Sequence, residues 1–291
     1  MNTFPRTTVG GKSLSRMIIG TNWFLGWSHT TAAKDWYITT HVKDRKNIAD
    51  IIEVFVKAGV DTVMGNIQCD PLHDSIQDVQ QRTGKKITMV STPGFPVNPD
   101  VVTGKGWNLG EVAKILDREA ELGADFCMPH TSTTDCLIDK VLREVRGMDT
   151  LCKMIRERGM IPGLSTHVPE SIIFADETNL DVETYISIFN SMGFLMQVEV
   201  DWVAQVIRNA KKPVMTIKSM AAGQLRPFQA LTFAWNAIRE QDMITVGTMS
   251  TKEAEELVEI SMNILSKQAV TVKLQETRSK STIKPKEPAK V

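Results

Sequence analysis

Histidine side chains give the first chemical signal in this sequence. All five lie in connections that follow short apolar segments, or at the ends of such segments, and they are His29, His41, His73, His130 and His167. Imidazole titrates near neutral pH and is the commonest metal ligand, so histidines at such places are candidates for acid/base catalysis or metal binding. We expect His130 and His167 to be catalytic, because they end neighbouring apolar segments.

A bound metal is one way to use these histidines. Zn²⁺ takes nitrogen and sulfur ligands and keeps one position open for water in catalytic sites. The candidate ligands for a Zn-type divalent ion are His130, His167, Cys69 and His73. The sequence has no HxH, HExxH or CxxC spacing, so metal-free acid/base catalysis remains an open alternative.

Lys218 lies near the end of the apolar run "PVMTIKS". A lysine in such surroundings is costly to bury unless it is paired or its pKa is lowered. It can then serve as a Schiff-base nucleophile, a general base or a clamp for an anionic group. The structural alternative is an ion pair with a barrel carboxylate, and we expect Asp61 to form a charged pair with Lys218 below the substrate.

The segment "TVGTMSTKEAEELVEIS" predicts a capped helix that can receive a phosphate. Ser250 is the expected N-cap, because Glu253 three residues later completes a capping box. A helix N-terminus beside a glycine-containing turn is a favourable phosphate site. The candidate phosphate-binding residues are Gly223, Arg226, Thr248, Ser250 and Thr251. A capped helix needs no ligand, so this alternative also stays open.

Three further residues are expected in the same pocket. Asn66 and Asn190 close apolar segments with an amide that both donates and accepts hydrogen bonds. Trp23 belongs to an aromatic-rich connection that either lines a substrate pocket or plugs the mouth of the fold.

These residues are carried by a repeating pattern of a short apolar strand, a polar turn and an amphipathic helix. The expected strands are 16–22, 60–65, 86–92, 124–130, 160–167, 183–190, 213–219 and 243–248. Helices are expected at 44–59, 108–123, 139–159 and 198–212. Eight such units predict an α/β fold, a single (β/α)8 TIM barrel with its site at the C-terminal ends of the strands. An open doubly wound sheet would require a GxGxxG turn, and "GTNWFLGWSH" does not supply one.

Composition narrows the class of protein. Lys+Arg and Asp+Glu are equal at 34 each, so no overall charge attracts nucleic acid or an anionic membrane. No apolar run reaches the length of a membrane span, and the N-terminus lacks the apolar core of a signal peptide. The four cysteines have no disulfide spacing, which favours reduced thiols and a cytoplasmic protein. The barrel is expected over residues 1–266, followed by a basic, flexible tail at 267–291.

Over roughly residues 6–262 the chain resembles the aldo-keto reductase superfamily. The resemblance is carried by "RTTVGGKSLSRMIIGTN", which is similar to the family's opening hairpin and first strand, and by "GVDTV", "ADFCMPH" and "AWNAIREQDMITVGTMSTKEAEE". It implies a TIM barrel, NADP as a cofactor, and a catalytic Asp, Tyr, Lys and His. Asp61 and His130 match two of these four, whereas the Tyr falls on Asn66 and the Lys on Ser91 or Thr92.

We therefore expect a small-molecule enzyme. The leading hypothesis is lyase, isomerase or hydrolase chemistry on a small oxygenated substrate, with or without a phosphate group. Histidine would act as the acid/base group or as a metal ligand. One alternative is an NADP-linked oxidoreductase of aldo-keto reductase type with an altered tetrad. Another is a catalytically silent barrel that binds a ligand. The oligomeric state is not predicted.

Overall fold

Eight parallel strand segments form a closed barrel in the computed structural model, which describes residues 3–271. They are β3 (Met17–Gly20), β4 (Thr62–Gly65), β5 (Thr88–Ser91), β6 (Phe126–Cys127), β9 (Ile161–Pro162) with β10 (Leu164–Thr166), β11 (Tyr185–Ile188), β12 (Val214–Ile217) and β13 (Met243–Val246). β9 pairs with β6 and β10 pairs with β11, so the fifth strand, interrupted at Gly163, joins the two ends of the sheet. The predicted TIM barrel is confirmed, and each expected strand range contains an observed strand.

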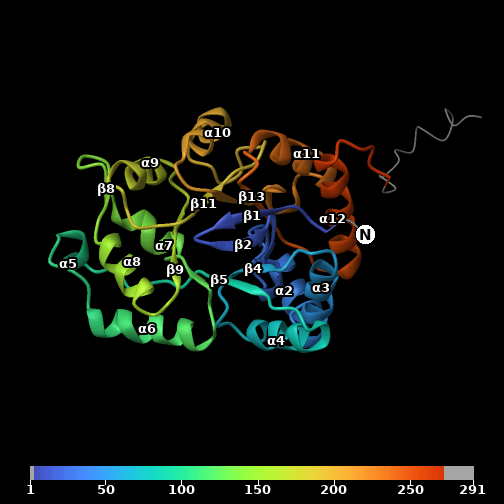
Figure 1. The fold of residues 1–291 in the computed structure, drawn as a ribbon, viewed down its shortest axis with the longest axis horizontal. Helices are drawn as coiled ribbons and strands as arrows, with labels where there is room; N and C mark the ends of the chain where they lie inside the picture. The colour runs from blue at the N-terminus through green and yellow to red at the C-terminus, as the bar shows by residue number, and fades with distance from the viewer. Residues whose placement is uncertain (1–2, 272–291) are drawn as a thin grey trace, which may run out of the picture.

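The helices surround this barrel (Figure 1). The α-helices are α1 (Asn22–Leu25), α2 (Ala32–His41), α3 (Arg45–Lys57), α4 (Leu72–Thr83), α5 (Pro99–Val102), α6 (Leu109–Glu121), α7 (Thr131–Thr134), α8 (Met148–Arg156), α9 (Glu170–Glu177), α10 (Val200–Asn209), α11 (Pro227–Ala237) and α12 (Thr251–Leu265). Two 3-10 turns are η1 (Asp135–Leu137) and η2 (Ala221–Gly223). Amphipathic helices such as α3 turn their buried residues toward the strands, as their periodicity predicts.

One expected helix is wrong over its first half. Residues 139–159 were expected to be one helix, but a hairpin of β7 (Ile138–Asp139) and β8 (Glu144–Val145) precedes α8. The Asp139 carboxylate accepts hydrogen bonds from the N–H groups of Val141 and Leu142, which stabilises the turn instead of a helix.

An N-terminal hairpin covers one end of the barrel. Its strands β1 (Arg6–Val9) and β2 (Lys12–Ser15) are antiparallel, and in Figure 1 they lie over the centre of the ring of helices. Val9 and Leu14 are buried in the cluster that fills the barrel interior. The predicted opening hairpin is therefore confirmed.

The same hairpin corrects the expected position of Asp61. Asp61 precedes β4, and its carboxylate accepts a hydrogen bond from Arg6 of β1 at 2.9 Å. It therefore lies at the end of the barrel that the hairpin covers, opposite the C-terminal ends of the strands. The side chain at the start of a parallel strand cannot reach the catalytic face, so Asp61 is not an active-site residue.

No helix among residues 3–271 has the length and apolar character needed to cross a membrane. The expected tail at 267–291 lies outside the described residues from position 272 onward.

Candidate active site

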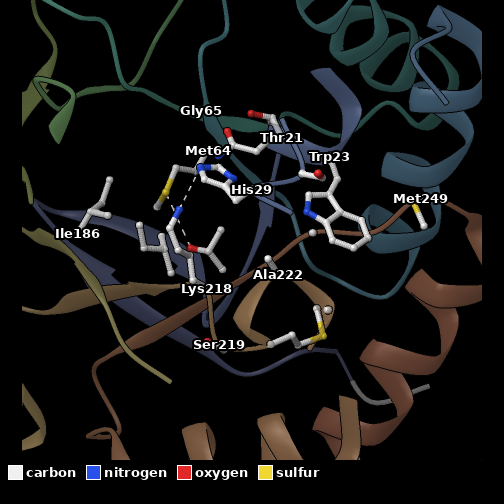
Figure 2. A pocket seen from close by; sticks show the side chains of 18 of the residues that line it. Thr21, Trp23, His29, Met64, Gly65, Ile186, Lys218, Ser219, Ala222 and Met249 are labelled. Atoms are coloured by element: carbon white, nitrogen blue, oxygen red, sulfur yellow. Dashed lines mark hydrogen bonds between the residues drawn. The ribbon is translucent and has the colours of Figure 1, made fainter. Parts of the chain in front are cut away.

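A cavity of about 540 Å³ lies at the C-terminal ends of the strands. The strand ends and the turns after them supply its polar lining, which includes Thr21, Asn66, Thr92, His130, Ser165, His167, Lys218 and Ser219. Figure 2 shows Lys218 and Ile186 toward one side and Met249 on the other, with Trp23 between them. We call the part around Lys218, His130 and His167 the Lys218 end, and the part around Met249 and Glu253 the α12 end.

Like the cations Lys34 and Arg226, Lys218 lines this cavity. It follows β12, is half-buried, and has a left-handed backbone with φ 61°. Desolvation by burial lowers the pKa of its amine to about 8. Within residues 3–271 it forms no ion pair with a carboxylate, so the expected pair with Asp61 is absent.

His29 approaches Lys218 from the connection after β3. The Nζ of Lys218 lies 3.4 Å from the Nε2 of His29 (Figure 2). The Nδ1 of His29 lies 3.1 Å from the carbonyl oxygen of Trp27, which can only accept, so Nδ1 carries the proton. Desolvation and the charge of Lys218 lower the pKa of His29, which favours the neutral ring. Its bare Nε2 therefore faces the amine as a proton acceptor.

His130 has the opposite tautomer. The backbone N–H of Ser132 donates to His130 Nδ1 at 3.2 Å, so Nδ1 carries no proton in the neutral ring. Burial and the charge of Lys218 lower the pKa of His130, which again favours the neutral form. Its Nε2–H is then a hydrogen-bond donor for a molecule in the cavity.

His167 is held beside these groups by its backbone. Its N–H donates to the carboxylate of Asp135 at 3.2 Å, and the same carboxylate accepts from the hydroxyls of Thr131 and Thr166. Asp135 thus ties the ends of β6 and β10 together. Burial, followed by the charge of Lys218, lowers the pKa of His167 to about 4, so this ring is neutral at pH 7.

The four expected metal ligands do not come together. His130 and His167 line the cavity, but Cys69 does not, and His73 hydrogen-bonds the carbonyl of Leu122 between α4 and α6. Among the described residues 3–271, no group of three or more His, Cys, Asp or Glu side chains is arranged to hold a metal ion. The predicted Zn-type set is therefore wrong for Cys69 and His73.

Only two of the five expected phosphate-binding residues line the cavity. Gly223 and Arg226 line the cavity, whereas Thr248, Ser250 and Thr251 do not. As predicted, Ser250 caps α12 and accepts the N–H of Glu253 at 3.2 Å.

The N-terminus of α12 already has an anion of its own. The Glu253 carboxylate accepts the N–H of Met249 at 2.6 Å, and Glu256 also lines the cavity. These two carboxylates repel a phosphate, whereas Arg226, which lines the same cavity, attracts one.

Of the three further residues predicted for the pocket, two line the cavity and one does not. Asn66 and Trp23 line the cavity, and the Trp23 ring lies beside Gly223 and Gly247, where added side chains would contact it. Asn190 is buried, and its amide is bonded to Phe194 of its own loop, so it is not a pocket residue.

Sequence reasoning named His29 among five candidate histidines without placing it beside Lys218, and it missed Thr21, Ser219 and Asp135. Thr21 and Ser219 line the cavity, and Asp135 positions two of its loops. His29 and Thr21 follow the first strand and Ser219 follows Lys218, so position at a strand end was the available signal. No local pattern could indicate Asp135, because its partners come from two different strand ends.

Comparison with solved structures places this barrel among known folds. A protein assigned as an aldo-keto reductase, from Pseudomonas aeruginosa, matches with a TM-score of 0.62 and 15% identity, over 89% of this chain and 95% of that one. The aldo-keto reductase MGS-M4 from a Medee basin deep-sea metagenome library gives 0.56 and 8%, over 91% and 96%. The barrel is aldo-keto-reductase-like. Rubisco from Pyrococcus horikoshii OT3 also matches, with a TM-score of 0.51 and 10% identity over 78% and 57%.

This likeness concerns the fold. No protein-family model and no curated protein matches the sequence. The structural neighbours are enzymes of different classes, and a shared barrel does not fix a reaction. Of the residues that the resemblance aligns with the reductase tyrosine and lysine, Asn66 and Thr92 line the cavity, while Ser91 bonds Glu119.

Proposed function

We propose that this barrel is an enzyme that acts on a small carbonyl compound through an imine with Lys218, which is chemistry of the lyase type. The observation that carries the proposal is a half-buried lysine that has no carboxylate partner among residues 3–271, has its pKa lowered to about 8, and lies beside three histidines. An amine in such surroundings is a better nucleophile than an exposed lysine, because more of it is uncharged.

The lowered pKa has a large effect on the reactive form. With a pKa of about 8, about 10% of Lys218 is neutral at pH 7, roughly 300-fold more than for an ordinary lysine. The three neighbouring histidines have lowered pKa values, so they are neutral and carry no positive charge of their own.

The tautomers of two histidines suit the proton transfers of imine formation. The bare Nε2 of His29 can accept a proton from the Lys218 amine as it attacks the carbonyl carbon. The Nε2–H of His130 can hydrogen-bond the carbonyl oxygen as negative charge develops on it. The amine nitrogen loses two hydrogens in total and the carbonyl oxygen leaves as water, so atoms and charge balance.

Borohydride trapping tests this function directly. The protein is incubated with a panel of small aldehydes, ketones and 2-oxo acids and then reduced, and the intact mass and labelled peptide are measured. We expect one stable adduct, at Lys218, and none in the Lys218→Met variant. Lys34→Met is the matched control, because Lys34 also lines the cavity, and it should retain the adduct. Absence of an adduct across the panel, or equal labelling of Lys218→Met, would refute the imine.

NADP-linked carbonyl reduction is a second candidate. The aldo-keto-reductase-like fold and the extension of the cavity to Gly247 and Leu257, at the end of β13 and in α12, favour it. The carboxylates of Glu253 and Glu256 on α12 disfavour it, because they repel the phosphates of NADP. A rise in melting temperature with NADPH that saturates would support this function, because a ligand that binds the folded state stabilises it. No rise at millimolar NADPH would count against it.

A further inference from the structure

We propose that the substrate carries a carboxylate next to its carbonyl group, as in a 2-oxo acid, and that this anion binds at the Lys218 end. The inference rests on the proposed function, because it takes Lys218 as the amine that meets the carbonyl carbon. It replaces the sequence-based expectation that an anionic group binds at the N-terminus of α12.

The charged side chains of the cavity come from different elements: the cations Lys34, Lys218 and Arg226 lie outside α12. Of the described residues, the only carboxylates that line the cavity are Glu253 and Glu256, both on α12. The Lys218 end contains the Lys218 amine and the neutral rings of His130 and His167. A partly buried cation without a counter-ion is unfavourable, and a bound anion relieves this cost.

Two buried hydroxyls without partners among residues 3–271 belong to residues that line the cavity, Thr21 and Ser219. Rotation about χ1 can turn each hydroxyl toward a ligand. With the Nε2–H of His130 they make three donors, which matches the two carboxylate oxygens and one carbonyl oxygen of a 2-oxo acid.

The position of these donors indicates a carboxylate close to the carbonyl. Ser219 directly follows Lys218 and both residues line the cavity, so we place the anion beside the carbon that the amine attacks. A phosphate is usually bound by arginine or a helix N-terminus, and Arg226 lines the cavity from the N-cap of α11, not from the turn that carries Lys218. Ile186 and Ile217 supply apolar wall for the rest of a small substrate.

Binding of unreactive analogues tests this inference separately from the imine. Oxamate has the shape and charge of a small 2-oxo acid, but its amide does not form an imine, and oxamide is its neutral counterpart. Calorimetry at pH 7 should show oxamate binding at least about tenfold tighter than oxamide. Ser219→Ala and Thr21→Val should each weaken oxamate binding about three- to tenfold, with little effect on oxamide.

A variant at the α12 end is the matched control. Glu256→Gln should leave the affinity for oxamate within about twofold, because Glu256 is exposed and lies at the other end of the cavity. Far-UV circular dichroism and melting temperature confirm that each variant is folded. If Ser219→Ala does not fold, Thr21→Val alone carries the comparison.

The outcomes separate the two proposals. Equal binding of oxamate and oxamide, or tighter binding of inorganic phosphate than of oxamate, would overturn the carboxylate site. If borohydride traps neutral ketones as readily as 2-oxo acids, the imine stands and the carboxylate inference fails. If oxamate binds and depends on Ser219 while no carbonyl compound is trapped, the anion site stands and the imine fails.

Discussion

Lys218 and His29 face one another with unusual backbones. Both have left-handed φ values, 61° and 60°, which L-residues other than glycine adopt only at a cost. Residues with such strain persist where the surrounding structure holds them, and they often belong to functional sites. The loop of His29 is held by Asp35, whose carboxylate accepts the N–H of Ser28 at 2.8 Å. The neighbouring structure thus maintains the contact between amine and imidazole.

Replacing Lys218 should stabilise the fold at neutral pH. The folded protein binds a proton at Lys218 less tightly than the unfolded chain, so this group contributes a destabilisation below pH 8 that is lifted as pH rises toward 10.5. We expect Lys218→Met to raise the free energy of unfolding by about 1–3 kcal/mol at pH 7 and by less at pH 9.5. Urea unfolding at both pH values measures this difference.

Lys153→Met is the control for that experiment, because Lys153 is an exposed lysine of α8. It should change the free energy of unfolding by less than about 0.5 kcal/mol at either pH. A Lys218→Met protein that is less stable than the wild type at pH 7 would contradict an uncompensated buried charge.

Glu119 makes stability depend on pH in the opposite direction. It is buried on α6, where burial raises the pKa of its carboxyl, and it accepts a hydrogen bond from Ser91 of β5. The folded state therefore binds this proton more tightly, and its stabilising effect is present at low pH and lost as pH rises through the raised pKa. Glu119→Gln should be more stable than the wild type by about 1–2 kcal/mol at pH 8, with the gap closing near pH 4.5. Thermal unfolding of both proteins between pH 4.5 and pH 8 measures this difference in stability. A difference that does not change with pH would refute the prediction.

At the scale of elements, the N-terminal hairpin explains the role of Asp61. The Arg6–Asp61 pair joins β1 to the start of β4, and both side chains are partly exposed. The contact stabilises the closed end of the barrel and lies away from the cavity.

Asp61→Asn therefore distinguishes a structural from a catalytic carboxylate. We expect it to lower the free energy of unfolding by about 0.5–1 kcal/mol, as for other partly exposed pairs. Borohydride trapping at Lys218 should keep its rate within about twofold. A loss of trapping with the fold intact would place Asp61 in the site after all.

Element prediction succeeded where local pattern and tertiary packing agree. The strand that carries Lys218 and the helix capped by Ser250 were both readable from apolar spacing and capping residues. It failed at residues 139–147, whose charged and apolar residues also suit a helix. Local hydrogen bonds of Asp139 and pairing between Ile138 and Val145 stabilise the hairpin there.

At the scale of the whole molecule, closure of the barrel joins its first half, β3 to β6, to its second half, β11 to β13. The fifth strand pairs through Ile161–Pro162 on one side and Leu164–Thr166 on the other. At the interruption, Met128 lies so close to Gly163 that an added Cβ would be 2.4 Å from its methyl carbon. One apolar cluster inside the barrel is therefore shared by strands from both halves.

We expect the barrel to unfold as one cooperative unit. Tryptophan fluorescence reports on six residues in different parts of the fold, Trp23, Trp107 and Trp235 among them, and far-UV circular dichroism reports on all helices. Their urea transitions should coincide, since losing one side of the fifth strand opens the whole sheet. Two transitions with separate midpoints would show that the halves unfold independently.

The sequence by itself determined the eight strand–helix units and the placement of Lys218, His130 and His167 at strand ends, because hydrophobic period and turn residues are local properties. Only the tertiary structure decided that Asp61 pairs with Arg6 at the opposite end, that His29 reaches Lys218, and that Glu253 occupies the α12 end. These contacts join segments whose approach depends on barrel closure and loop geometry, or on the direction in which one side chain turns. Residue spacing along the chain does not specify any of them.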